Sequence, residues 1–210
     1  MPAVPEQHHF ALGHALIVVG FGSGDDHARA VAPIREQLAP LFEIVTPIPY
    51  AELQLMLDAA APWGVHAYEK TVDVDDLSDG VIATLTEFAP RKTSPMSFVP
   101  IFRLDGAFCR VGEDDTAFGG RRTPHYAMHL AATSPDPAAL PADRTWVRSL
   151  WDALRPLAQS DGGYVNFIGE VDDERVRAAY GPQKYERLAR IKAEYDPGNI
   201  LRRNANIKPA

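Results

Sequence analysis

The chain has 210 residues, 46% of them hydrophobic, and a formal net charge of −7. This length and apolar fraction suit one globular domain with a sizeable core, plus extensions. The negative charge, with no basic block to offset it, argues against binding to nucleic acid or to an anionic membrane surface. The single cysteine, Cys109, excludes an internal disulfide framework and a cysteine-rich metal site, and it fits a reducing, cytoplasmic setting.

The first half of the chain contains no membrane or metal signal. No apolar run approaches the roughly 20 residues that span a bilayer, and residues 1–13 form an arm without the basic and apolar pattern of a signal peptide. His8 and His9 are adjacent, so regular structure would point them apart. We therefore expect no metal site and a cytoplasmic location.

Residues 14–22 and 42–48 are rich in β-forming side chains, and residues 25–38 have a helical apolar period. This predicts a strand–helix–strand unit with Asp25 or Asp26 capping the helix. Glycines at positions 20, 22 and 24 suggest a dinucleotide-binding loop. However, the fingerprint needs a further glycine where Asp25 stands. A turn with a helix cap is the main interpretation, and a nucleotide-binding protein is a weaker alternative.

The middle of the chain mixes strands and helices. Helices are predicted at residues 50–57, 75–88 and 144–157, and strands at 65–72, 97–104, 107–112 and 124–133. Asp105-Gly106 is a strong hairpin signal between two of these strands. Strands gathered around hairpins, with helices between groups, predict an α+β fold in which a large antiparallel sheet carries helices on one face.

The C-terminal fifty residues show a distinctive series of motifs. Tyr164 and Asn166 are two apart, which on a predicted strand would place both on one face. An apolar stripe at helical spacing follows. The series comprises Tyr164-x-Asn166, Ala179-Tyr180-Gly181, Glu186-Arg187-Leu188, Asp196-Pro197-x-Asn199 and Asn204-x-Asn206-Ile207.

These five linked motifs closely resemble the C-terminal signature of the berberine-bridge-enzyme-like family of FAD-linked oxidases. Weaker matches are Pro49-Tyr50-x-x-Leu53-Gln54 and Asp115-Thr116-Ala117-Phe118-x-x-Arg121. The resemblance implies a substrate-binding α+β domain over residues 14–160 and a berberine-bridge-type segment over 161–210. It further implies FAD as cofactor and hydride removal from an alcohol- or amine-type carbon of a small molecule.

The family's flavin-binding half has no counterpart in residues 1–210, so the resemblance implies that a partner subunit or the rest of a longer protein supplies it. A chain shaped for such a partner would expose an apolar patch, which a second copy of itself is also able to cover. The rival hypothesis is a non-catalytic binding or self-assembling protein that kept the fold and lost FAD.

The resemblance also points to site residues. Tyr164 would lie beside the substrate and flavin, either as a base or as part of the wall, while Asn166, Asn204 and Asn206 would contact the flavin. A phenol ionises near pH 10, so a base role requires hydrogen bonds or positive charge nearby. His129, on the face of a predicted strand, is a candidate second base.

Substrate contacts are predicted at the sheet, from Phe102, Asp105, Arg110 and Tyr126. Asp105 stands where relatives usually have glycine, so it either alters substrate choice or serves only as a turn residue. Arg110 is a cationic candidate for a carboxylate-bearing substrate.

Overall fold

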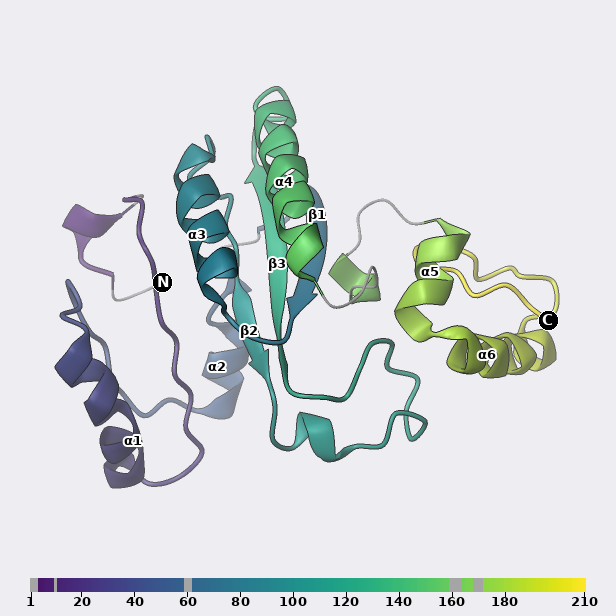
Figure 1. The fold of residues 1–210 in the computed structure, drawn as a ribbon, viewed down its shortest axis with the longest axis horizontal. Helices are drawn as coiled ribbons and strands as arrows, with labels where there is room; N and C mark the ends of the chain where they lie inside the picture. Colours follow the sequence, from purple (N-terminus) through teal and green to yellow (C-terminus); the bar gives the residue numbers. More distant parts are fainter. Residues whose placement is uncertain (1–3, 10, 59–61, 159–163, 168–171) are drawn as a thin grey trace. The chain divides into compact units, whose positions relative to one another are not determined.

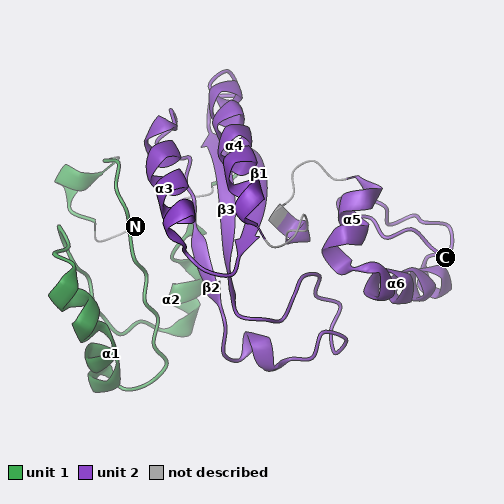
Figure 2. Ribbon diagram, in the orientation of Figure 1, with its two compact units in different colours: residues 1–64 green, residues 65–210 purple. Residues whose placement is uncertain are grey.

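The computed structural model describes residues 4–9, 11–58, 62–158, 164–167 and 172–210. It divides into two compact units, Met1–Gly64 and Val65–Ala210 (Figure 2). The first unit contains a short 3-10 turn and two helices. These are η1 (Glu6–His8), α1 (Gly24–Gln37) and α2 (Tyr50–Leu55).

Helix α1 begins one residue before the predicted start, because Ser23 is its N-cap. The Ser23 hydroxyl oxygen accepts a 3.1 Å hydrogen bond from the Asp26 amide. The prediction that Asp25 or Asp26 caps the helix is therefore wrong. Both carboxylates instead stand in the first turn, where negative charge interacts favourably with the helix dipole.

The two predicted strands of this unit do not form. Residues 14–22 and 42–48 are described and carry no strand, so the strand–helix–strand prediction is wrong. Both runs are rich in side chains that favour strands. A strand is stable, however, only when a neighbouring strand forms hydrogen bonds with its backbone N–H and C=O groups. None of the described residues pairs with either run.

The second unit is built on a three-stranded antiparallel sheet in the order β1-β3-β2 (Figure 1). The strands are β1 (His66–Val74), β2 (Ile101–Leu104) and β3 (His125–Ser134). In the register, Thr71 lies opposite His129 and Phe102 lies opposite Ala127. The predicted α+β class with an antiparallel sheet is confirmed.

Helices α3 (Asp79–Phe88) and α4 (Leu140–Leu154) pack against one face of this sheet. Alternation along β1 and β3 turns their apolar side chains toward these helices. The buried core consists of Tyr68, Val72, Val74, Val81, Met128, Leu130, Ala132, Trp146, Val147, Leu150 and Leu154. The indole N–H of Trp146 donates to the Phe88 carbonyl at 2.8 Å, so the buried tryptophan is satisfied.

Helix α4 starts four residues before its predicted start, and a buried aspartate in its first turn ties it to a distant loop. Asp143 is 1% exposed. Its carboxylate accepts hydrogen bonds from the amides of Thr93 and Ser94, at 2.6 and 2.9 Å, and from the Ser97 hydroxyl. Burial alone would raise the pKa of Asp143, but the donors outweigh it and hold the pKa below its ordinary value.

The predicted hairpin at Asp105-Gly106 is wrong. After Gly106, with φ +57°, the chain enters the 3-10 turn η4 (Phe108–Arg110) rather than a strand. The Phe108 amide donates to the Asp105 carbonyl, and the next two amides repeat this three-residue pattern. The amides of residues 108–110 are therefore satisfied locally, and β2 pairs with β3 across a long connection.

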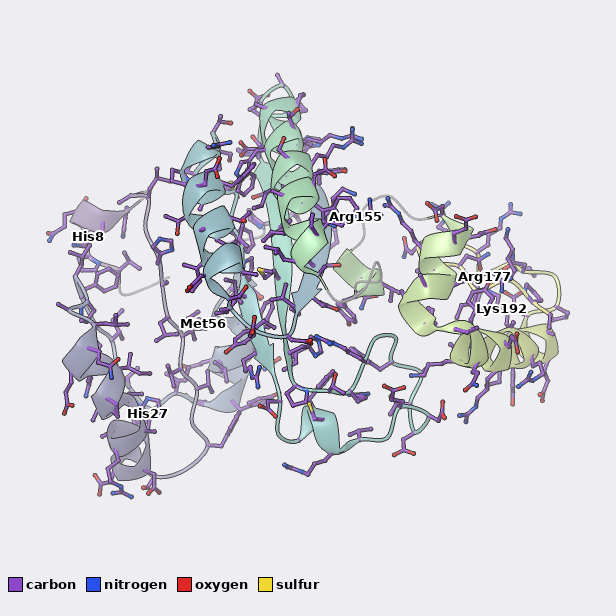
Figure 3. The ribbon with its side chains drawn as sticks, in the orientation of Figure 1. His8, His27, Met56, Arg155, Arg177 and Lys192 are labelled. Carbon is purple, nitrogen blue, oxygen red and sulfur yellow. The ribbon has the colours of Figure 1, made fainter. Side chains whose placement is uncertain are left out.

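The C-terminal region holds helices α5 (Asp173–Tyr180) and α6 (Pro182–Tyr195), separated by Gly181. The tail packs on these helices: Ala205 and Ile207 contact the cluster of Val176, Tyr185 and Ala189. Arg177 projects from α5 (labelled in Figure 3). Its guanidinium lies over the Tyr185 ring, 4.1 Å from the ring centre. The tail is thus anchored on α5 and α6 through the side chains of Ala205 and Ile207.

The Tyr164-x-Asn166 segment is not a strand. Its described part is the 3-10 turn η6 (Val165–Phe167), with Tyr164 just before it. Residues 162 and 163, which belonged to the predicted strand, lie outside the described residues. Among the described residues, no helix is long and apolar enough to cross a bilayer.

Candidate functional site

The sheet face opposite α3 and α4 carries ionisable and aromatic side chains from all three strands. In β1 the half-buried residues Glu69, Thr71 and Asp73 alternate with the core residues. The register places His125, Ala127 and His129 of β3 beside them, and Phe102 and Leu104 of β2 beyond. We call this surface the polar face of the sheet.

Tyr164 and Asn166 meet in spite of the lost strand. The Asn166 side-chain amide donates a 2.6 Å hydrogen bond to the Tyr164 hydroxyl oxygen. The 3-10 turn η6 lies against β1, which brings the pair to the sheet. A donor aimed at a phenolic oxygen stabilises negative charge there, as a base or a substrate-orienting hydroxyl requires.

A row of rings joins Tyr164 to the sheet. The Tyr164 ring stacks on Phe118 with centroids 5.6 Å apart, and Phe118 meets Phe108 edge-on at 5.4 Å. Phe108 in turn meets His125 at 6.1 Å. The Arg122 guanidinium lies over both phenylalanine rings, 4.5 Å from Phe118 and 4.6 Å from Phe108. These contacts fix Tyr164 relative to the start of β3.

His125 is 3% exposed and lies at the inner end of this row. Its Nδ1 is 2.6 Å from the Thr123 carbonyl oxygen, which can only accept, so Nδ1 carries the proton and Nε2 is the basic nitrogen of the neutral ring. Burial raises the pKa of the nearby Asp73 carboxyl, and attraction to His125 and Arg121 offsets this only in part. The raised pKa makes Asp73 a carboxyl that holds its proton more readily than an exposed aspartate does.

His129, the predicted second base, is 8% exposed on the same face. Its Nε2 lies 3.4 Å from a Glu69 carboxylate oxygen, and the Phe98 ring meets it edge-on at 6.2 Å. His129 stands four residues beyond His125 along β3, roughly 13 Å away. The polar face thus has two separate histidine–carboxylate neighbourhoods.

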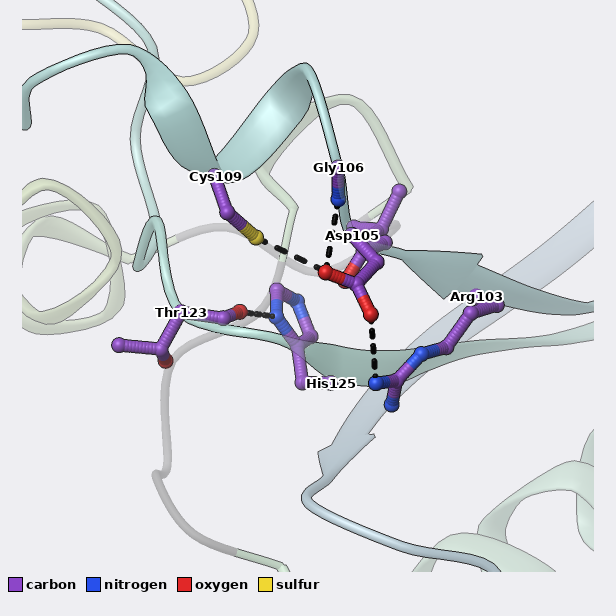
Figure 4. Close-up of polar contacts among 7 residues, drawn as sticks. Arg103, Asp105, Gly106, Cys109, Thr123 and His125 are labelled. Carbon is purple, nitrogen blue, oxygen red and sulfur yellow. Dashed lines mark hydrogen bonds and ion pairs between the residues drawn. The ribbon is translucent and has the colours of Figure 1, made fainter.

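The predicted substrate contacts are scattered. Phe102 is 44% exposed on the polar face. Asp105 lies just past β2, where it accepts from the Gly106 amide at 2.7 Å and the Arg103 guanidinium at 2.8 Å (Figure 4). These two hydrogen bonds, led by the one from Gly106, lower the pKa of Asp105. The carboxylate of Asp105 therefore stabilises the turn that follows β2, which is one of its two predicted roles.

The remaining two lie away from the polar face. Arg110 is exposed at the end of η4. Tyr126 packs toward the helix-side core, with the Arg103 guanidinium 4.8 Å from its ring centre. Because Tyr126 and His129 are an odd number apart on one strand, they point to opposite faces. Tyr126 therefore does not line the surface that carries His129.

Asn204 and Asn206 lie in the tail beyond α6. Asn204 is exposed with φ +59°, and its carbonyl accepts from the Asn206 amide at 2.8 Å. The Asn206 Oδ1 atom is buried and finds no hydrogen-bond partner among the described residues. Such an orphan acceptor costs about 1–3 kcal/mol, so a donor from outside the described residues would stabilise the tail.

The described residues fit one part of FAD and not the other. Aromatic rings, a donor–acceptor pair and an unmet acceptor suit the flat ring system of a flavin, which needs orientation and polar edge contacts. The glycine-rich loop before α1 does not offer a binding site for the pyrophosphate of FAD. There Ser23 already occupies the Asp26 amide, and the first turn bears two carboxylates.

Sequence reasoning missed several members of the site, namely Glu69, Asp73, Phe108 and the inner role of His125. Arg122 was one of the cationic candidates and Phe118 belonged to a motif match, but their contacts with the rings were not predicted. The alternation of Glu69, Thr71 and Asp73 with apolar neighbours was a readable signal for the polar face. The ring contacts were not readable, because they join segments far apart in the chain.

Residues 163–208 match the family model "Berberine and berberine like". An FAD-linked oxidoreductase from Dictyostelium discoideum is 24% identical over 171 residues, which cover 81% of this chain and 37% of that protein. The (R)-6-hydroxynicotine oxidase of Paenarthrobacter nicotinovorans is 49% identical over 113 residues, covering 50% of this chain and 25% of the oxidase.

Two solved structures share the fold. The 6-hydroxy-D-nicotine oxidase of Arthrobacter nicotinovorans superposes with a TM-score of 0.70 at 23% identity, over 90% of this chain and 43% of that one. A variant of berberine bridge enzyme gives 0.70 at 17% identity, over 90% and 44%. The chain thus spans less than half the length of these relatives. With its C-terminal domain, its relatives and its fold in agreement, it belongs to the berberine-bridge-enzyme-like family of FAD-linked oxidoreductases.

Proposed function

We propose that this chain forms the substrate-side wall of an FAD-dependent oxidoreductase that takes a hydride from an alcohol- or amine-type carbon of a small molecule. The flavin-binding half would come from a partner subunit or from the rest of a longer protein. The observation that carries the proposal is the polar face, whose ionisable groups are joined to the Tyr164–Asn166 pair by the row of ring contacts.

The proposed reaction needs a proton acceptor, because a hydroxyl or ammonium group loses a proton when its carbon loses a hydride. Tyr164 is the first candidate, since Asn166 donates to its hydroxyl oxygen. His129 is the second, with the Glu69 carboxylate beside it to stabilise an imidazolium. Bound FAD would supply the hydride acceptor, and the chain's own residues would orient the substrate and hold the proton.

A chimaera tests this proposal. Residues 14–210 replace the matching part of the 49% identical 6-hydroxynicotine oxidase, and the product is compared with the unmodified oxidase and with the bare flavin-binding half. We expect the chimaera to purify yellow and its flavin to be bleached by some alcohols or amines under anaerobic conditions. The chain by itself should not retain FAD after gel filtration.

The rival hypothesis has its own outcome. A folded chimaera that keeps no flavin, together with an isolated chain that forms a dimer protecting Tyr164 from chemical modification, would identify a non-catalytic assembly protein. The exposed apolar side chains of the first unit, such as Phe21 at 83% and Leu41 at 85%, are the observation that keeps this alternative in view.

A further inference from the structure

The loop that carries Phe118 is held by the C-terminal helices. The Gly120 amide donates to the Ala179 carbonyl at 2.8 Å. The Lys184 ammonium donates to the Phe118 carbonyl at 2.7 Å, across 66 positions of sequence. The Arg187 guanidinium donates to the Asp114 carbonyl at 2.8 Å. Three hydrogen bonds thus fix one loop of the sheet domain onto α5 and α6.

The approach is close because the loop has glycine where the helices touch it. A Cβ atom at Gly119 would lie 3.1 Å from the Ala179 carbonyl oxygen and 3.2 Å from the Tyr180 ring. The first distance is to backbone, which cannot swing away. A side chain at this position would therefore force the loop and α5 apart by a few tenths of an ångström.

Lys184 is the unusual member of this contact, because it is only 9% exposed. Lysines are rarely so buried, since removing an ammonium group from water is costly unless polar partners replace the water. Here the Phe118 carbonyl is such a partner, and a charge-assisted hydrogen bond is stronger than a neutral one. The position of the Phe118 backbone is consequently set by α6.

The ring of the same residue supports Tyr164. Phe118 stacks on Tyr164 at an interplanar angle of 23° while the Arg122 guanidinium lies over Phe118. We propose that Lys184 is a positioning residue, which acts through Phe118 to set the place of the Tyr164 hydroxyl. The inference rests on the proposed function for its catalytic meaning, but the mechanical link is a property of this chain alone.

The test compares the variant Lys184→Met with two control variants. Lys184→Arg keeps a donor of similar reach, and Arg190→Met removes a charge from an exposed position of the same helix. Proton NMR of the isolated chain reports the nuclear Overhauser contacts between the Phe118 and Tyr164 rings. We expect Lys184→Met to lose them, Lys184→Arg to restore most of them, and Arg190→Met to leave them intact.

If Lys184→Met fails to fold, Gly119→Ala loosens the same contact without removing a charge, and it should shift the Tyr164 ring signals in the same way. Unchanged ring contacts in whichever of these two variants folds overturn the inference. In the flavin-loaded chimaera, the displacement should slow flavin reduction about 10-fold to 100-fold with little change in substrate KM. Lost ring contacts with an unchanged rate would retain the mechanical link and remove Tyr164 from the proposed chemistry.

Discussion

The Asn166 amide donates to the Tyr164 hydroxyl oxygen at 2.6 Å although Asn166 lies on a 3-10 turn, with Tyr164 just before it, instead of both lying on a strand. If Tyr164 accepts the substrate proton, Tyr164→Phe should slow flavin reduction in the chimaera by about 10²- to 10⁴-fold. Asn166→Leu, which removes only the donor, should slow flavin reduction less than Tyr164→Phe. Anaerobic stopped-flow absorbance measures both.

His129→Gln is the companion variant for that prediction. A larger loss of rate in His129→Gln than in Tyr164→Phe would transfer the base role to the histidine beside Glu69. Equal and small losses in all three variants would contradict an acid–base role for this surface.

Removal of the Asp143 carboxylate should destabilise the second unit. Asp143→Ala leaves the Thr93 and Ser94 amides and the Ser97 hydroxyl without their acceptor, and we expect a loss of about 2–4 kcal/mol in the free energy of unfolding. Urea denaturation followed by tryptophan fluorescence measures it. Asp152→Asn, exposed on the same helix, should stay within about 0.5 kcal/mol of the parent chain.

Asp73 should make the free energy of unfolding fall as the pH rises. Burial raises its pKa in the folded state, so its ionisation opposes folding, and stability is lost as the pH rises through that value. Asp73→Asn should therefore match the parent chain below pH ~4 and become the more stable of the two toward neutral pH. Exposed Asp76→Asn is the control, and a difference independent of pH would refute the assignment.

Gly181→Ala should destabilise the α5–α6 corner. Gly181 has φ +75° and ψ 154°, a region almost closed to side-chain-bearing residues, so the substitution should cost about 1–3 kcal/mol. Gly80→Ala provides a control of opposite sign. Its new methyl would make only an ordinary 3.7 Å contact with Leu157, and helix α3 should gain up to about 1 kcal/mol. Thermal denaturation should show a lower melting temperature for Gly181→Ala and a higher one for Gly80→Ala than for the parent chain.

The sequence predicts best where the signal is local. The helical stripes predicted the ends of α1, α3 and α4 to within about four residues, and the strand containing His129 was placed to within about one residue. Errors arose where two choices were locally equivalent. Asp105-Gly106 does make a tight turn, but the amides of residues 108–110 donate to carbonyls three residues back, so they are not available to a neighbouring strand.

The candidate site was only partly predictable for a related reason. Tyr164 and Asn166 were found through a motif, and their contact survives a change of secondary structure because two residues on a tight turn can also meet. The support from Phe118, Phe108 and Arg122 depends on tertiary contacts between separate loops. No periodicity or spacing in the sequence carries that information.

The extended runs at residues 14–22 and 42–48 have a practical consequence for anyone who prepares this protein. Leu16, Ile17, Val18 and Val19 are all 42% exposed or more, and such β-prone stretches readily join neighbouring molecules edge to edge. Overproduction without a complement that covers them should lead to inclusion bodies. Simultaneous synthesis with a fitting flavin-binding half should raise the recoverable yield.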